Sequence, residues 1–267
     1  MWAVEITEPI MSDKHVFYLG DTSLSGAAGY LAGLMSAFGI GFDYRPSDRA
    51  VSASDLKTPR KLFILSDYAS KQMPADAQAA LLAQVQTGAG LLMIGGWESF
   101  HGHGGDWDDT PIARALPVEI SGEDDRINCD QPALLIKSAD HEIVADLPWE
   151  DRPPTVGGFN RFTANPRSET LLIVERFSAR YEAGRFQFDP QAQDPMLVIG
   201  THGQGRTAAL ATDLAPHWVG GLVDWGDGDR ITAQAPGSWQ IEVGNFYAQF
   251  IANLLAWTGQ LHHEKLS

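Results

Sequence analysis

The chain has 267 residues, of which 44% are hydrophobic and 20% charged, the composition of an ordinary globular protein. Its 34 acidic and 19 basic residues give a net charge of −15, which disfavours a nucleic-acid partner or an anionic membrane surface. Cys129 is the only cysteine, which excludes an internal disulfide, and no apolar run is long enough to span a membrane.

In chain order, residues 1–14 are expected to form an arm that precedes a single domain of residues 15–267. The arm carries acids and a proline where a secretory signal needs a basic and then an apolar segment, so we expect a cytoplasmic protein. Strands are predicted at 15–20, 42–44, 62–65 and 91–94, with helices between residues 25 and 39 and between Pro74 and Gly88. This alternation predicts a doubly wound, mainly parallel sheet.

The second half of the chain is less regular. Strands are predicted at 133–137, 171–175 and 196–200, and Gly203-Gln204-Gly205 then leads into a strand at 206–212. Because that connection is so short, the last two strands are expected to form an antiparallel hairpin. Residues 213–244 read as a loop region rich in Trp, Gly and Asp, and residues 245–258 as a final helix.

Three aspartates, Asp21, Asp67 and Asp213, each follow an apolar strand. If the strands are parallel neighbours, the three carboxylates converge with Glu98 at one edge of the sheet, where open α/β sheets bind ligands. The alternative is that each aspartate caps a helix or turn that follows it. The sequence leaves both interpretations open.

The stretch GGWESFHGHGGDWDD follows the strand at 91–94 and contains the best candidate metal ligands, His101, His103 and Asp106, with Asp108 close by. Imidazole and carboxylate groups at this spacing can share one ion, but short clusters in glycine-rich loops are more commonly exposed or hydrogen-bonded. We assign no metal. No cofactor is expected either, since Gly203-x-Gly205-x-x-Ala208 leads into a strand rather than the helix that a dinucleotide fingerprint requires.

Four side chains are candidates for acid, base or nucleophile chemistry: Glu98, Ser99, His101 and His217. Ser99 lacks the flanking glycines of a hydrolase elbow, and His217 follows a predicted core strand, where it could act as a general base or acid. The predicted loops also hold five tryptophans that could line a pocket or pack the loops down: Trp97, Trp107, Trp218, Trp225 and Trp239.

Several segments in a fixed order resemble one family. They are HVFYLGD, GLLMIGGWESF, TPIARALPVEI, HEIVADLPW followed by GGFNRF, and GQGRTAALATDLAPHW. Together they resemble the putative glutamine amidotransferase-like family, a branch of the class I amidotransferase fold that is related to trehalose-utilisation proteins. The resemblance implies a flavodoxin-like sheet with its crevice at the end of the strand at 91–94.

The sequence departs from working class I glutaminases at the positions that carry their chemistry. The resemblance implies a Gly-x-Cys-x-Gly elbow after this strand and a downstream His-x-Glu pair that activates the cysteine. Here the elbow positions hold Gly95, Gly96, Trp97 and Glu98, and His217 is followed by Trp-Val. Cys129 lies well past the elbow, so cysteine glutaminase activity is not expected.

The leading hypothesis is therefore a protein that binds or acts on a small polar molecule, with a sugar-like molecule as the type considered. The predicted ligand-binding residues are Asp21, Asp67, Trp97, Glu98 and Asp213. The alternatives are a metal-dependent hydrolase using His101, His103 and Asp106, and a non-catalytic structural or assembly module. A small-molecule ligand and a homo-oligomer are the partners considered.

Overall fold

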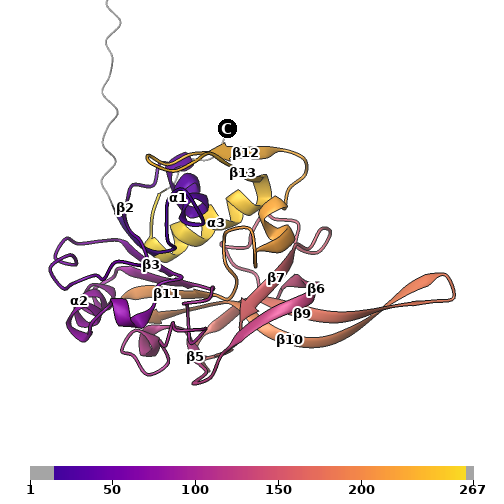
Figure 1. Cartoon of the computed structure of the whole chain (residues 1–267), viewed down its shortest axis with the longest axis horizontal. Coiled ribbons are helices and arrows are strands. Elements are labelled where there is room, and N and C mark those ends of the chain that lie inside the picture. Colours follow the sequence, from indigo (N-terminus) through magenta and orange to yellow (C-terminus); the bar gives the residue numbers. More distant parts are fainter. Residues whose placement is uncertain (1–14, 263–267) are drawn as a thin grey trace, which may run out of the picture.

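A nine-stranded sheet forms the centre of the computed structural model, which describes residues 15–262 (Figure 1). The predicted arm of residues 1–14 lies outside this range. Five strands are mutually parallel: β2 (Phe42–Arg45), β1 (Val16–Gly20), β3 (Leu62–Ser66), β4 (Gly90–Ile94) and β11 (Gly205–Leu210). They lie side by side in that order, which is the flavodoxin-like order 2-1-3-4-5. The predicted fold class is confirmed.

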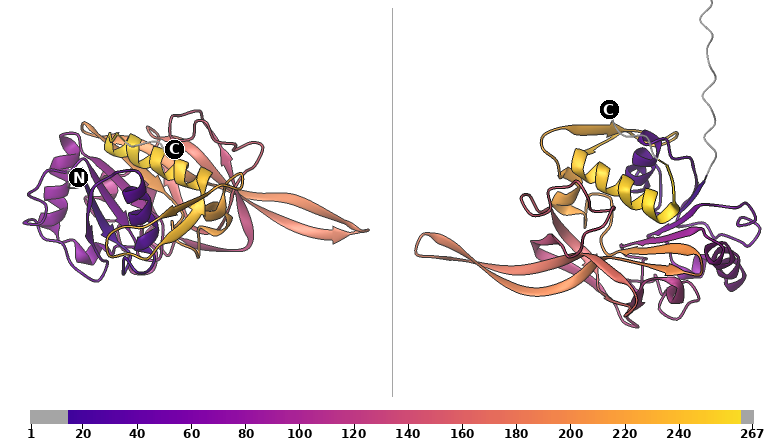
Figure 2. Two further views of the ribbon diagram at one scale, coloured as in Figure 1. Left: turned by 90° about the horizontal axis from the view of Figure 1, so that it is seen from above. Right: turned by 180° about the vertical axis from the view of Figure 1, so that it is seen from behind.

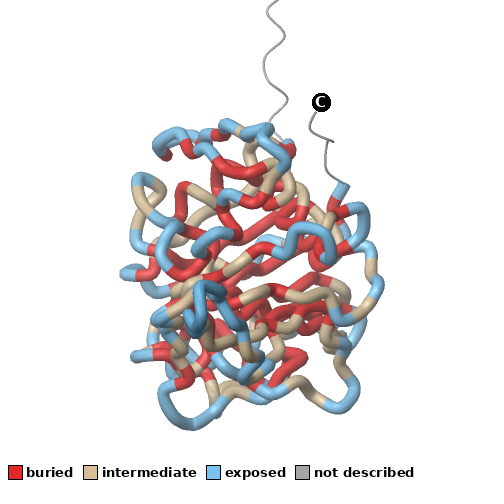
Figure 3. The backbone as a smooth tube through the Cα atoms, turned by 90° about the vertical axis from the view of Figure 1, so that its right-hand side faces the viewer, coloured by how far each residue is buried: buried red, intermediate tan, exposed pale blue. Residues whose placement is uncertain are grey.

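The parallel strands form because their side chains are apolar on both faces. Every residue of β1, β3 and β4 is buried, as is typical of strands covered by helices on both sides. Helices α1 (Ala28–Ala37) and α3 (Asn245–Gly259) cover one face, and α2 (Ala75–Gln86) covers the other (Figures 1 and 2). The tube coloured by burial shows the same layering, with buried strands inside and exposed turns around them (Figure 3).

The antiparallel part of the sheet is larger than predicted. The hairpin of β10 (Arg185–His202) with β11 is confirmed, and three more strands extend the sheet beyond it: β9 (Glu169–Glu182), β6 (Arg126–Lys137) and β7 (Thr155–Asn160). The predicted strands at 133–137, 171–175 and 196–200 are only the more buried parts of β6, β9 and β10, respectively. Their remaining halves alternate polar and apolar residues, and β10 contains Pro190, a residue that disfavours a strand assignment.

The region 213–244, predicted as loop, contains short regular elements. Strands β12 (Arg230–Ala233) and β13 (Ile241–Gly244) pair as a separate hairpin, and a 3-10 turn, η3, spans Gly220–Asp224. A second small sheet joins β5 (Val118–Ile120) to β8 (Phe162–Ala164). Two other 3-10 turns are η1 (Ser70–Gln72) and η2 (Ala113–Ala115). Strands of three or four residues are too short to show a periodic pattern in sequence.

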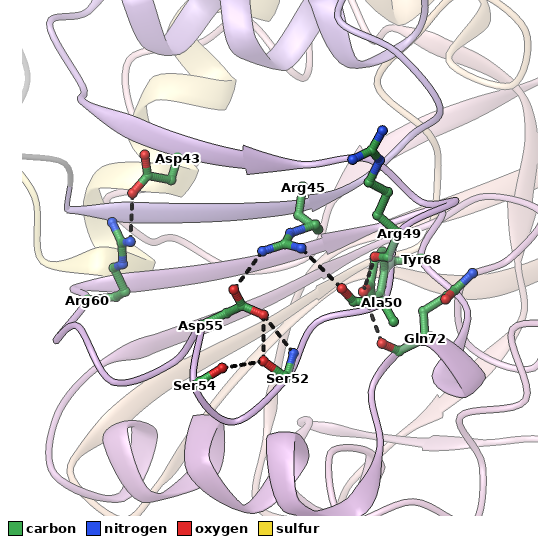
Figure 4. A network of polar contacts seen from close by, with 10 residues as sticks. All are labelled: Asp43, Arg45, Arg49, Ala50, Ser52, Ser54, Asp55, Arg60, Tyr68 and Gln72. Carbon is green, nitrogen blue, oxygen red and sulfur yellow. Dashed lines mark hydrogen bonds and ion pairs between the residues drawn. The ribbon is translucent and has the colours of Figure 1, made fainter.

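The connection between β2 and β3 is held by charged and polar contacts (Figure 4). The Arg45 guanidinium pairs with Asp55 at 2.9 Å, and Arg60 pairs with Asp43 at 2.6 Å. The Tyr68 hydroxyl donates to the carbonyl of Arg49 at 2.8 Å. The two ion pairs tie the connection to β2, and the Tyr68 bond ties it to the segment after β3, where Asp67 lies.

No helix within residues 15–262 is long and apolar enough to cross a membrane.

Candidate functional site

Asp21 and Asp67 occupy the turns that follow β1 and β3. Both have left-handed backbones, with φ of 43° and 47°, a conformation that aspartate tolerates better than most residues. The backbone N–H of Asp21 donates to the carbonyl of Ser66 at 2.8 Å, which holds the two turns together. Because β1, β3, β4 and β11 are parallel, their carboxyl ends bring Asp21, Asp67, Gly96 and Asp213 to one edge of the sheet.

The three aspartates lie close enough to change one another's ionisation. Burial, followed by the charges of Asp213 and Asp67, raises the pKa of Asp21 well above its usual value. Burial, followed by the charge of Asp67, raises the pKa of Asp213 to about 7. The structure therefore brings together the three carboxylates that the sequence placed at strand ends. Their role in ligand binding stays a prediction.

Glu98 and His217 extend this acidic group. Burial raises the pKa of Asp67 to about 6; the Glu98 charge raises it further and the His217 charge opposes the rise. Both side chains therefore lie within electrostatic range of Asp67. We call Asp21, Asp67, Glu98, Asp213 and His217 the carboxyl-edge cluster.

Hydrogen bonds fix the orientation of each aspartate. The Tyr18 hydroxyl donates to the Asp21 carboxylate, and the Glu98 N–H donates to Asp67 Oδ1 at 2.8 Å. Asp213 Oδ1 accepts the backbone N–H groups of Leu214 and Ala215, the latter at 3.0 Å. Asp213 thus caps the turn after β11 and also lies near the other carboxylates, so for this residue both interpretations left open by the sequence hold.

Ser99 links two segments of the site. Its side chain is buried, and its Oγ accepts the backbone N–H of Asp67 at 2.9 Å. This bond joins the end of β3 to the loop after β4. The contact gives Ser99 a positioning role, and its predicted catalytic role stays a prediction.

The three candidate metal ligands point to different neighbours. His101 Nδ1 lies 2.8 Å from Asp108 Oδ1. The exposed His103 instead lies within electrostatic range of Asp124, whose pKa is lowered mainly by its hydrogen bond with Arg126 and only slightly by His103. Asp106 is exposed. Within residues 15–262, no three His, Cys, Asp or Glu side chains are placed to hold a metal ion.

Sequence reasoning missed the polar residues that shape the loop after β4. Asn160, fully buried at the end of β7, accepts the Gly96 N–H at 2.8 Å through Oδ1 and donates to Asp125 at 2.8 Å through Nδ2. The buried Asp125 carboxylate in turn accepts the N–H groups of His101 and Gly102, each at 3.0 Å. The only sequence signal for this role is a lone asparagine at the end of the segment GGFN, and the sequence does not indicate which residues it contacts.

Gly95 and Gly96 leave no room for side chains. A Cβ on Gly95 would lie 1.9 Å from the carbonyl oxygen of Ala211, and one on Gly96 would lie 2.1 Å from Asp67 Oδ1. The two glycines let the end of β4 approach β11 and the Asp67 carboxylate directly. The carboxylate thereby fills the space beside the strand end.

The tryptophans of the loops divide between packing and exposure. Trp107 is buried and donates from Nε1 to the carbonyl of Tyr68 at 2.8 Å, and Trp218 and Trp225 are also buried. Trp97 is 46% exposed, with the guanidinium of Arg126 4.4 Å from its ring centre. Trp239 is exposed as well. Packing therefore accounts for three of the five, and Trp97 leaves an aromatic surface immediately after Gly96.

Cys129 lies on β6 and is half-buried. Burial raises the pKa of its thiol, and the charges that act on it belong to Arg176, Asp130 and Asp194. A raised thiol pKa is the opposite of what an activated cysteine nucleophile requires.

A depression of about 820 Å³ lies at the other edge of the sheet, lined by residues that include Lys61, Gly88 and Gln260. Lys61 precedes β3 and Gly88 precedes β4, so this is the amino edge of the parallel strands. The depression and the carboxyl-edge cluster are therefore separate features.

The family model described as "Putative glutamine amidotransferase" matches residues 48–235. This stretch covers most of the chain, including β3, β4, β11 and all of the carboxyl-edge cluster except Asp21. The chain belongs to this family, as its sequence resemblance predicted.

Solved structures share the fold over nearly the whole chain. The Salmonella typhimurium LT2 protein described as cytoplasmic protein STM1381 is 23% identical, with a TM-score of 0.68, covering 91% of this chain and 98% of its own. Cytoplasmic protein STM3548 of Salmonella typhimurium is 22% identical, with a TM-score of 0.66, over 94% and 100%. A ThuA-like protein of Parabacteroides merdae is 11% identical, with a TM-score of 0.56, over 96% and 93%. The comparison with curated proteins finds no match.

Proposed function

We propose that this family member binds a small, neutral, hydroxyl-rich molecule at the carboxyl-edge cluster and does not release ammonia from glutamine through a cysteine thioester. The observation that carries the proposal is the convergence of Asp21, which is buried, with the half-buried Asp67 and Asp213 at the edge of an α/β sheet where such folds bind ligands. Burying like charges together opposes folding, and side chains with strongly shifted pKa values in such places are candidates for function.

The shifted pKa values indicate the kind of ligand. With pKa values of about 6 and 7, Asp67 and Asp213 are partly protonated near neutral pH. A protonated carboxyl donates a hydrogen bond and an ionised one accepts, so the pair can serve both sides of a ligand hydroxyl. The part of the Trp97 ring that the Arg126 guanidinium leaves exposed offers an apolar surface for the carbon face of such a molecule.

The residues that follow β4, together with Cys129, argue against glutaminase chemistry. The positions after β4 hold two glycines and Trp97, and the pKa of Cys129 is raised rather than lowered. Cys129 also lies among charges of β6, β9 and β10 rather than beside Gly95 and Gly96.

The test is saturation-transfer NMR with glucose, a glucose disaccharide, inositol and glycerol as probes, on the wild type and on Asp67→Ala and Asp213→Ala. We expect at least one probe to bind and its affinity to fall about tenfold or more in each variant, the loss of a hydrogen bond to a charged group. Glu142→Gln is the matched control, because Glu142 is exposed near the carboxyl end of α3, at the amino edge of the sheet.

Two results would contradict the proposal. One is a set of probes that all fail to bind, or that bind equally well to the wild type and both alanine variants. The other is ammonia release from glutamine that disappears in Cys129→Ser.

A further inference from the structure

Strands β9 and β10 continue past the body of the molecule as a two-stranded arm. Figures 1 and 2 show this hairpin projecting away from the helices and from the rest of the sheet. The arm comprises residues 177–190, in which Phe177 pairs with Pro190 and Glu182 pairs with Arg185 across the turn. An isolated two-stranded hairpin is only marginally stable in water, so an arm of this length needs a surface to pack against.

One face of the arm is apolar along its whole length. Residues paired across an antiparallel ladder share a face, and alternate residues of a strand do so as well. By the observed register, six residues share this face: Phe177, Ala179, Tyr181, Phe186, Phe188 and Pro190. The opposite face carries Ser178, Arg180, Glu182, Arg185, Gln187 and Asp189.

The aromatic side chains of the apolar face contact one another and stay open to solvent. The ring centres of Tyr181 and Phe186 lie 5.0 Å apart, and those of Phe177 and Phe188 lie 5.6 Å apart. Tyr181 and Phe186 are each 65% exposed and Phe188 is 62% exposed. Residues 15–262 leave five large apolar side chains exposed, and three of them lie on this face. Patches of this kind in water-soluble domains mark interaction sites.

We propose that the apolar face of the arm binds the same face of a second copy of this chain, forming a two-fold symmetric dimer. A two-fold interface requires a self-complementary patch, and a face without charged groups satisfies that requirement. Charge favours the arms as the place of contact. The whole chain carries −15, so two bodies repel, whereas the charges of the arm cancel: Arg180 and Arg185 balance Glu182 and Asp189.

The size of the face sets the expected strength. Each exposed aromatic ring has on the order of 100 Å² to bury, so the three contribute roughly 300 Å² per chain, below the ~800 Å² per partner of a stable complex. The dimer is therefore expected to be weak and to form only as the protein concentration rises.

Sedimentation velocity between about 1 and about 200 µM tests the proposal on the full chain. We expect the wild type to shift from monomer to dimer in this range. The triple variant Tyr181→Thr/Phe186→Thr/Phe188→Thr keeps strand-favouring residues and should stay monomeric, weakening association at least tenfold. The matched control, Ser178→Thr/Gln187→Thr, changes the opposite face and should dimerise like the wild type.

A cysteine placed on the arm gives a readout that does not depend on the stability of the triple variant. In a Cys129→Ser background, Ala179→Cys lies on the apolar face and should form a disulfide-linked dimer on oxidation, whereas Gln187→Cys on the opposite face should not. A wild type that stays monomeric throughout the range overturns the proposal. So does a triple variant that dimerises like the wild type, or equal cross-linking from both faces.

Discussion

The ionisation of Asp213 affects both the charge of the site and the stability of the fold. Burial, followed by the charge of Asp67, raises the pKa of Asp213 to about 7 from the usual 3.8. Between those values the folded protein binds more protons than the unfolded chain. Stability is therefore highest below about pH 4 with respect to this group, and it falls as the pH rises to about 7.

Replacing Asp213 by Asn should stabilise the protein at high pH. The Asn side-chain oxygen can still accept the Leu214 and Ala215 N–H groups, while the buried negative charge is removed. We expect the free energy of unfolding to rise by about 1 to 3 kcal/mol at about pH 8, and by much less at about pH 5. Urea denaturation at the two pH values measures both changes. The exposed Glu142→Gln should change neither, and an Asp213→Asn variant that is destabilised equally at both would contradict the electrostatic argument.

Asn160 tests the polar contacts beneath the loop. Its side chain joins Gly96 to Asp125, so Asn160→Ala leaves the Gly96 N–H and one carboxylate oxygen without these bonds. We expect a loss of about 2 kcal/mol and faster hydrogen exchange at the Gly96 amide. The comparison variant is Asn165→Ala, which removes one half-buried bond to the Leu116 carbonyl and should cost under about 1 kcal/mol. Unchanged exchange at Gly96 would show that Asn160 does not hold the loop.

The sequence predicted the acidic residues of the site but not the residues that hold them in place. Asp21, Asp67 and Asp213 follow apolar strands, and the rule that parallel strands end at one edge brings them together. Asn160 contacts Gly96 across 64 residues and Asp125 across 35. No local pattern encodes those pairings, and the left-handed backbone of Asp21 and Asp67 likewise appears only when the strands are placed.

At the scale of elements, the end of β4 depends on two glycines. A methyl group on Gly95 would meet the backbone carbonyl of Ala211, an atom that cannot move without disturbing β11. We expect Gly95→Ala to lower the free energy of unfolding by about 3 kcal/mol. Gly26→Ala is the control: its nearest neighbour is a carbonyl oxygen 3.4 Å away, so the change should stay within about 0.5 kcal/mol. Equal thermal stability of the two variants would contradict the close approach.

Elements were predictable where one physical signal dominated. The short runs of apolar residues in β1, β3 and β4, with glycines or polar residues at their ends, are typical of strands covered on both faces. Strands β12 and β13 are too short for a periodic signal. In the outer halves of β9 and β10, polar and apolar residues alternate, but these halves become recognisable as strands only once their pairing with each other is known. Pro190 in β10 made the arm still harder to predict.

At the scale of the whole molecule, charge and apolar surface are segregated. The chain carries a net charge of −15, and carboxylates with raised pKa values gather at the carboxyl edge of its sheet. The exposed aromatic face lies on an arm whose own charges cancel and which projects away from that body (Figure 1). The proposed ligand binding at the carboxyl-edge cluster and dimerisation through the arm are therefore independent of each other.

The carboxyl-edge cluster is tested most directly by measuring the ionisation of its aspartates. A ¹³C NMR titration of the aspartate carboxyl carbons should show one group with a pKa of about 6 and one of about 7, and Asp67→Asn and Asp213→Asn should each remove one of them. If instead every aspartate that titrates does so near the usual 3.8, the carboxylates neither share a buried site nor offer both donors and acceptors to a ligand.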